Sequence, residues 1–283
     1  ANTLLVGGSL TASVSTTATS SSGGVLIFSI LAGSGSATVD PVTGFVTAIG
    51  SGTVTLIAIS TGDINYLPAI ASQTITIGAG PQTLTITSAN VLLVGDSLTA
   101  SVNTTATSSS GGSITFSIVT GSGSATVDPV TGLIAAVRSG TVTLIANSTG
   151  DVNYLSASTS QTIVISAGPQ TLIITSSDML LVGGSLTASV STTATSSSGG
   201  AISYTMTTLG SGSATVNPVT GFITAISSGT VNLIASTTGD TNYLSATTSQ
   251  LITIDVGPQT LTITSANTLL VGGSLTASVS TTA

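Results

Sequence analysis

A segment of 88 residues recurs along the chain, and this repetition limits the fold more than any other feature of the sequence. The pentapeptide GPQTL begins at Gly80, Gly168 and Gly257, so successive copies lie 88 and 89 residues apart. Solenoid repeats are usually about 20 to 50 residues long, whereas a segment of this length can enclose a core of its own. We therefore predict tandem small domains, called here the first, second and third repeat and the final segment: residues 1–80, 81–168, 169–257 and 258–283. The first repeat lacks its first strand, and the final segment only begins a further domain.

The two ends of the sequence carry the same stretch. Residues 1–18 and 266–283 both read ANTLLVGGSLTASVSTTA. We infer that the sequence is a window cut from a longer array, and that the total repeat number, the anchor and the tip lie outside it. Two pairings of the first strand stay open at this stage. It pairs inside its own repeat, or it completes a neighbouring repeat or another chain.

Polar and apolar residues alternate over seven short runs of the second repeat: 82–88, 97–103, 113–119, 124–127, 132–137, 140–147 and 160–166. Such alternation, in runs rich in Val, Ile and Thr, predicts half-buried strands. Turn signals such as Asp128-Pro129 and Gly150-Asp151 separate the runs. About seven strands at a spacing of roughly 10 to 12 residues predict an all-β fold of tandem immunoglobulin-like antiparallel β-sandwiches.

Four motifs of the first repeat recur in the other two copies: ATVDPVTG at Ala37–Gly44, GTVTLIA at Gly52–Ala58, GDINY at Gly62–Tyr66 and SQTITI at Ser72–Ile77. With these motifs the chain resembles the tandem group 2-like immunoglobulin repeats of bacterial surface fibres and giant adhesins. The resemblance covers the whole chain. It implies the immunoglobulin-like fold and an extracellular or cell-surface location. The chain departs from typical members in having almost no charged residues, which points to a specialised environment or to heavy modification.

The composition excludes most chemistry. The chain has no Cys, His, Trp, Lys or Glu, and Arg138 is its single basic residue. Cys/His metal sites, thiol nucleophiles, Ser-His-Asp triads and Schiff-base lysines therefore cannot form. We predict that the protein is not an enzyme, that it has no catalytic, cofactor-binding or metal-binding residues and that it needs no cofactor. A net charge of −7 argues against nucleic acid as a partner, and no apolar run is long enough for membrane insertion.

Aspartates in two recurring loops are the only candidates for a metal site. The Gly-Asp-x-Asn-Tyr loop carries one aspartate per repeat, and its carboxylate and amide oxygens are ligands that calcium accepts. The alternative is a turn capped by the aspartate, with the tyrosine packed beneath it. Because each loop offers a single carboxylate, we interpret it as a turn. The second loop has Asp-Pro in two repeats and Asn-Pro in the third, and turn initiation tolerates that exchange. The residues concerned are Asp63, Asp151 and Asp240 in the first loop, with Tyr66, Tyr154 and Tyr243, and Asp40, Asp128 and Asn217 in the second.

Three further features do not recur as a required site would. Arg138 matches Gly50 and Ser227 in the other copies, so we expect an exposed side chain without a shared role. Asn103 and Asn147 begin N-glycosylation patterns that the other repeats lack, and we interpret them as chance matches. We interpret the Ser/Thr-rich stretches at 15–24, 103–112 and 191–200 as flexible polar hairpin loops, and the alternative is that they are sites of O-glycosylation.

The joints between repeats are short, which favours a mechanical function. Only Gly78–Pro81 separates the last strand of the first repeat from the first strand of the second, so we expect a semi-rigid rod. Sheet edges without lysine lack the usual protection against pairing between chains. The predicted function is a structural repeat of an extracellular filament, stalk or giant surface fibre, with neighbouring repeats and other copies of the chain as partners. The alternative is an adhesin repeat that binds a glycan or a cell surface directly.

Overall fold

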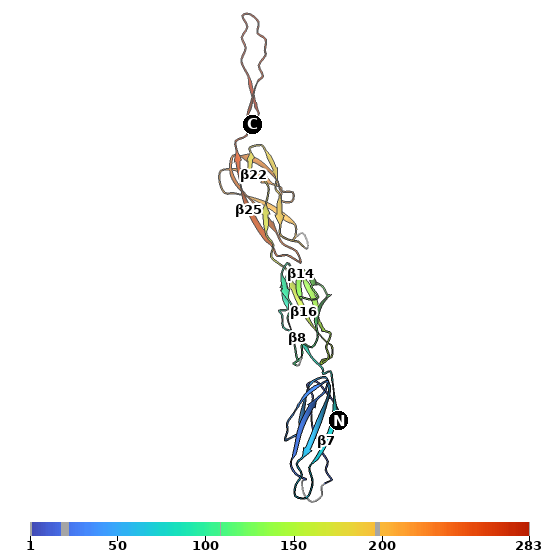
Figure 1. Cartoon of the computed structure of the whole chain (residues 1–283). Coiled ribbons are helices and arrows are strands. Elements are labelled where there is room, and N and C mark those ends of the chain that lie inside the picture. The colour runs from blue at the N-terminus through green and yellow to red at the C-terminus, as the bar shows by residue number, and fades with distance from the viewer. Residues whose placement is uncertain (1, 18–22, 108, 196–198, 283) are drawn as a thin grey trace. The chain divides into compact units, whose positions relative to one another are not determined.

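The computed structural model describes residues 2–17, 23–107, 109–195 and 199–282. Within these ranges all regular secondary structure is β, drawn as arrows in Figure 1, which confirms the all-β prediction. A search of the described residues finds no helix with the length and apolar character needed to cross a membrane.

The chain forms two compact units. The first consists of Ala1–Leu92, Ser97–Ala136 and Gly140–Val164, and the second of Leu93–Asp96, Val137–Ser139 and Ile165–Ala283. The division runs through the second repeat and does not follow the boundaries read from the sequence. Those domain boundaries therefore stay a prediction.

Two sheets make up the first repeat. One has the strand order β1 (Thr3–Leu5), β7 (Ala69–Gly78), β6 (Gly52–Ser60), β3 (Leu26–Ala32). The other has the order β2 (Ser9–Thr11), β5 (Phe45–Gly50), β4 (Ser36–Val39). Buried residues from both sheets form one core cluster, with Val46 from β5 beside Leu56 and Ile75 from β6 and β7. The repeat is therefore a β-sandwich.

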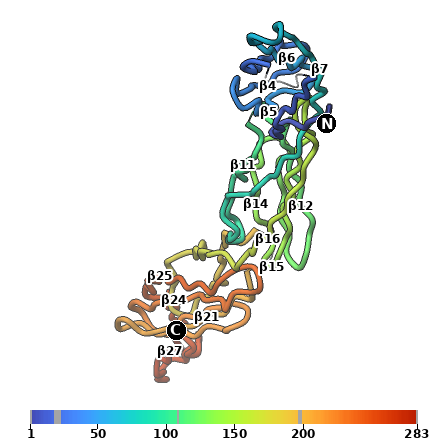
Figure 2. Tube along the Cα trace, turned by 90° about the horizontal axis from the view of Figure 1, so that it is seen from below, coloured from blue at the N-terminus to red at the C-terminus, as the bar shows by residue number. Residues whose placement is uncertain are grey.

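The second and third repeats keep this plan and add a third, two-stranded sheet. In the second repeat the sheets are β12-β15-β16-β9, β10-β14-β13 and β11-β8, and Figure 2 shows β12, β15 and β16 side by side. In the third repeat they are β18-β25-β24-β21, β19-β23-β22 and β17-β20, and β26 pairs with β27 in the final segment. The strand bounds are β8 Leu84–Ile86, β9 Val91–Leu93, β10 Ser97–Thr99, β11 Val102–Thr104, β12 Ile114–Thr120, β13 Ser124–Val127, β14 Leu133–Arg138, β15 Gly140–Ser148, β16 Ala157–Ser166, β17 Leu172–Ile174, β18 Met179–Leu181, β19 Ser185–Thr187, β20 Val190–Thr192, β21 Ile202–Thr208, β22 Ser213–Val216, β23 Phe222–Ser227, β24 Gly229–Thr237, β25 Ala246–Asp255, β26 Thr260–Ile263 and β27 Val279–Thr282.

The sandwich follows from the alternation of side chains along the long strands. In β15, Val142, Leu144 and Ala146 are buried, and the residues between them are not. Successive side chains of a strand point to opposite faces, so Val, Leu and Ala fill the core while Thr and Ile cover the outer face. The same pattern recurs in β6 and β24. The prediction of immunoglobulin-like sandwiches is confirmed.

The strands differ from the prediction in two details. The run Ser97–Asn103 is broken at Ala100 and Ser101, because β10 pairs with β14 while β11 pairs with β8 in another sheet. Each of the three repeats also has a strand that was not predicted: β1, β9 and β18. In the first and third repeats this strand pairs in parallel with the last strand, as β1 does with β7 and β18 with β25. The sheets are thus not purely antiparallel.

The open question about the first strand has an answer in the second and third repeats. Strand β8 pairs with β11, and β17 pairs with β20, so each first strand lies in its own repeat. In the first repeat the residues that match β11 are Val14–Thr16, which are described but belong to no strand.

Candidate functional site

The Gly-Asp-x-Asn-Tyr loop folds as a tight turn around its aspartate. Oδ1 of Asp151 accepts hydrogen bonds from the backbone amides of Asn153, at 2.8 Å, and Tyr154, at 2.9 Å. The same two bonds form at Asp63 and Asp240. An aspartate that binds the amides two and three residues later caps its own turn. The geometry therefore agrees with the turn interpretation of this loop.

In the second repeat this turn contacts the first repeat, within one compact unit. The backbone amide of Ser51 donates to Oδ1 of Asn153 at 2.9 Å, and Oγ of Ser51 donates to the carbonyl oxygen of Val152 at 2.6 Å. Ser51 lies between strands β5 and β6. Both the backbone and the side chain of one serine are therefore bonded across the boundary, which makes this a specific interface between repeats.

The linker between the two repeats is bonded to the same turn. The amide of Gly80 donates to the carbonyl oxygen of Asn153 at 2.8 Å, and the amide of Leu155 donates to the carbonyl oxygen of Gly80 at 2.9 Å. A Cβ at Gly80 would lie 2.2 Å from the carbonyl oxygen of Val6, so only glycine fits. The linker cannot swing away from the turn without breaking these bonds.

The ring of Tyr154 belongs to the core of the preceding repeat. It is 4% exposed and packs in the same cluster as Val6 and Ile77 of the first repeat. Its hydroxyl accepts a hydrogen bond from the amide of Thr107 at 2.9 Å, in the loop after β11. Tyr66, at the same position of the first repeat, is only half-buried. The tyrosine of this loop is thus buried where the loop forms the joint, and it is less buried in the first repeat.

The joint between the second and third repeats has the same contacts, and it lies within the other compact unit. The amide of Ser139 donates to Oδ1 of Asn242 at 2.9 Å. The amide of Gly168 donates to the carbonyl oxygen of Asn242, and the amide of Leu244 donates to that of Gly168, both at 2.9 Å. Asn242 and Tyr243 are 5% and 4% exposed. Because the bonds recur at two joints, the joint is a property of the repeated sequence.

Asp151 also ties a second loop to the joint. The hydroxyl of Ser109 and the amide of Gly111 donate to its Oδ2. The Ser109 bond is the main cause that lowers the pKa of Asp151, partial desolvation opposes it, and the amides of Asn153, Tyr154 and Gly111 lower the pKa further. Both carboxylate oxygens are therefore engaged in their ionised form.

Acid is expected to loosen this loop. Because folding lowers the pKa of Asp151, its ionised carboxylate stabilises the folded chain. This stabilisation is complete above the pKa of an aspartate in the unfolded chain, about 3.9, and it is lost as the pH falls through the lower pKa of the folded chain. We expect the protection factor of the Gly111 amide, measured by NMR hydrogen exchange, to fall below about pH 4. The variant Asp151→Asn should show reduced protection already at neutral pH, because an NH2 group in place of Oδ2 donates instead of accepting.

Asp128→Asn is the matched control. Oδ1 of Asp128 accepts from the amides of Val130 and Thr131, and the Thr131 amide is the main cause that lowers the pKa of Asp128. Asn217 makes the same pair of bonds in the third repeat. Protection of the Gly111 amide at neutral pH should therefore stay unchanged in Asp128→Asn. An equal loss of protection in Asp128→Asn and Asp151→Asn would show that the hydrogen bonds to Oδ2 of Asp151 do not hold the loop in place.

The remaining sequence candidates make none of the joint bonds described above, although Arg138 directly precedes Ser139. Asp40 caps its turn as Asp128 does. Arg138 is exposed at the end of β14. Asn103 and Asn147 lie inside paired strands, opposite Thr85 and Thr115. The Ser/Thr-rich stretches fall in part outside the described residues, at 18–22, 108 and 196–198. Where the structure is described, no three His, Cys, Asp or Glu side chains gather.

Two groups of residues at the joints were not identified from the sequence. Ser51 and Ser139 each precede a glycine, in a context that recurs in every copy. Gln82 and Gln170 each follow the linker proline and are 8% and 7% exposed. These residues recur from repeat to repeat, and that recurrence was the signal that the sequence offered. Recurrence does not distinguish a residue that stabilises a turn from one that makes a contact between repeats.

No family model matches the sequence, and no curated protein sequence matches it. Solved structures with a similar arrangement of strands include a SusE-like, surface-located polysaccharide-binding protein from the heparin utilisation locus of Bacteroides thetaiotaomicron, with 11% identity and a TM-score of 0.24 over 84% of this chain and 69% of that one. Domains 4–9 of the surface layer protein SbsC have 12% identity and a TM-score of 0.28 over 87% of this chain and 42% of that one. The three N-terminal domains of the outer capsid protein Hoc of bacteriophage RB49 have 11% identity and a TM-score of 0.26 over 91% and 97%. Each is a likeness in strand arrangement, and no function is inferred from it.

Proposed function

We propose that this chain is a structural, non-catalytic array whose repeats build length in an extracellular or cell-surface fibre or stalk. One observation carries the proposal. The bond from Ser51 to Asn153 and the bond from Ser139 to Asn242 connect equivalent residues and have the same length of 2.9 Å. A domain array that only tethers its parts has no need of such a joint. A joint that fixes each repeat on the next transmits force and orientation along the chain.

The composition supports the same role. The outer faces of the strands carry Thr, Ser and Ile, and the chain has no Lys or Glu. Sheet edges without charged residues are prone to pair with other chains. In a fibre such pairing holds neighbouring chains together, so self-association is part of the proposed function.

Direct glycan binding is the weaker candidate, because three of the four tyrosine rings are buried, whereas the exposed rings are those of Phe45 and Phe222. Proteins that bind sugars offer exposed aromatic faces, yet Tyr154, Tyr204 and Tyr243 are 4%, 8% and 4% exposed. Two of these rings hold the joints. We therefore assign a structural role to these three tyrosines.

Electron microscopy of the purified chain, paired with a glycan array, tests the proposal. The longest strands have 10 residues, which at about 3.3 Å per residue plus loops corresponds to roughly 40 Å per repeat. We expect uniform fibres with that periodicity and no signal above background on the array. Dispersed particles that bind one glycan class would overturn the proposal in favour of an adhesin.

A further inference from the structure

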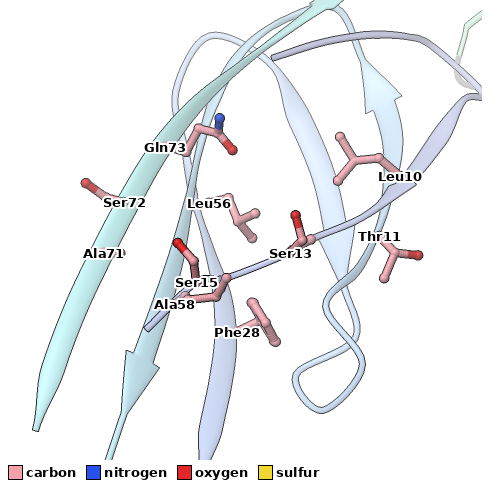
Figure 3. Close-up of a pocket in the computed structure, with 12 residues that line it drawn as sticks. Leu10, Thr11, Ser13, Ser15, Phe28, Leu56, Ala58, Ala71, Ser72 and Gln73 are labelled. Carbon is pink, nitrogen blue, oxygen red and sulfur yellow. The ribbon is translucent and has the colours of Figure 1, made fainter. Parts of the chain in front are cut away.

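The pocket of the first repeat offers no reactive side chain. Figure 3 shows it between the segment that carries Ser13 and the strand that carries Ala71. The described residues that line it are apolar residues, serine, threonine and glutamine, and none of them is charged. The side chain with the most distinctive chemistry lies elsewhere, at the second joint, and it is that of Arg138.

Arg138 gives the chain a single bond that one class of protease recognises. Proteases of the trypsin class cleave after a basic residue, because a carboxylate in their specificity pocket binds its side chain. Arg138 is the only lysine or arginine in the 283 residues, so the bond between Arg138 and Ser139 is the only bond of this kind. The matching positions of the other repeats hold Gly50 and Ser227. The first and third repeats therefore have no counterpart of this bond.

The two residues of this bond differ in how they are held. The side chain of Arg138 is exposed at the end of β14, so a specificity pocket can reach it. The amide nitrogen of Ser139, which is the nitrogen of the bond, donates to Oδ1 of Asn242 at 2.9 Å. Oγ of Ser139 donates to the carbonyl oxygen of Thr241 at 2.6 Å. The nitrogen side of the bond is thus held against the third repeat, within the second compact unit.

The chain after the bond is also held closely, within the first compact unit. Ser139 is the single residue between β14 and β15. A Cβ at Gly140 would lie 2.4 Å from the amide nitrogen of Gly123, and the amide of Thr141 donates to Oγ of Ser122 at 3.0 Å. Proteases cut segments that open locally. A tight hairpin that is bonded on both sides does not open while these bonds hold.

We propose that Arg138–Ser139 is a cleavage site for trypsin-like serine proteases, and that the second joint guards it. While the joint is closed, Asn242 and Thr241 hold Ser139, and the bond is not cut. When the joint opens, the protease hydrolyses the bond: one water is consumed, the C–N bond breaks, and a carboxylate forms on Arg138 and an amino group on Ser139. The inference goes beyond the proposed function, because it names an enzyme class as a partner.

Cleavage would remove the covalent continuity of the array at a joint that has come apart. Strand β12 lies in the fragment 1–138 and strand β15 in the fragment 139–283, and the two strands are paired over Ile114–Thr120. The fragments would therefore stay associated through hydrogen bonds and the shared core. They would separate only when the second repeat unfolds.

Limited digestion of the whole chain with trypsin tests the site. Denaturing electrophoresis and mass spectrometry report the fragments 1–138 and 139–283. The cleavage rate follows the population of the open form when reclosing is faster than cleavage. We expect the native chain to be cut slowly and Arg138→Ser to stay uncut. Asn242→Ala should be cut at least about tenfold faster than the native chain, because its side chain no longer accepts from the amide and the hydroxyl of Ser139. Equal rates in the native chain and in Asn242→Ala overturn the proposal.

Two pairs of variants separate the second joint from the first. Asn153 is the counterpart of Asn242 at the first joint, so Asn153→Ala should leave the cleavage rate unchanged. Gly168→Val should raise the rate, because a Cβ at Gly168 would lie 2.1 Å from the carbonyl oxygen of Val94. Gly80→Val makes the same change at the first joint and should leave the rate unchanged. Equal acceleration within either pair would show that general loosening of the chain, and not the second joint, exposes the bond.

The proposed function and this inference can fail separately. Fibres in the microscope from a chain whose cleavage does not depend on the joint would keep the structural role and remove the guarded site. Cleavage that depends on the joint, in a chain that forms no fibres and binds a glycan, would keep the site and remove the structural role.

Discussion

Replacing Tyr154 by alanine is expected to lower the local free energy of unfolding at the first joint by about 3 to 5 kcal/mol, the usual cost of truncating a buried aromatic side chain. The ring is 4% exposed and lies in the core cluster of the first repeat, so its removal leaves a cavity shared by two repeats. The hydroxyl also accepts the amide hydrogen of Thr107. Tyr154→Phe keeps the ring and should cost only about 1 kcal/mol.

Tyr66→Ala is the matched control for this prediction, because Tyr66 has the same place in its loop but is less buried than Tyr154. It is half-buried, and we expect a cost of about 1 kcal/mol, typical of an average substitution. Hydrogen exchange with mass spectrometry measures both variants in the whole chain, because the peptides STGDINYL and STGDVNYL differ in mass. Equal loss of protection in the two variants would mean that the joint adds nothing to the burial of Tyr154.

Replacing Gly80 by valine is expected to open the first joint while leaving both sandwiches folded. Its Cβ would lie 2.2 Å from the carbonyl oxygen of Val6, which belongs to the backbone and cannot move aside cheaply. The bonds from Gly80 to Asn153 and from Leu155 to Gly80 would break. Two hydrogen bonds at about 1 kcal/mol each correspond to roughly thirtyfold faster exchange of these amides.

The control for Gly80→Val is Gly78→Ala, two residues earlier. A Cβ there would meet Cδ2 of Leu5 at 3.4 Å, an ordinary contact, so the joint should keep its protection. If Gly80→Val left exchange at Leu155 unchanged, the close approach to Val6 would not be what holds the linker in place.

The sequence predicted the strands wherever alternation was clear. Runs such as Gly140–Asn147 alternate over nearly a full strand length, and the burial pattern of β15 follows that alternation. Strand β9 was missed because Val-Leu-Leu is only three residues long and apolar throughout. The break at Ala100 and Ser101 was missed because alternation continues while the chain changes sheets, and only pairing partners reveal such a change.

The joint was predicted only in outline. The short linker indicated restricted motion, and the turn role of Asp151 follows from its amide bonds. The partner of Asn153 was not predictable, because Ser51 lies 102 residues away and meets it only after both repeats have folded. The buried role of Gln82 depends in the same way on Gly111 and Leu155, which fold over it from elsewhere in the repeat.

Spin-label distances across the first joint test the central claim, that the joint fixes one repeat on the next. The chain has no cysteine, so Thr74→Cys and Thr162→Cys place labels at equivalent exposed positions of two successive repeats. Pulsed electron paramagnetic resonance should give one narrow distance distribution in the otherwise native chain, and a broad one once Gly80→Val is added. A distribution that is already broad without Gly80→Val would contradict the account, since the repeats would then move independently despite the bonds between them.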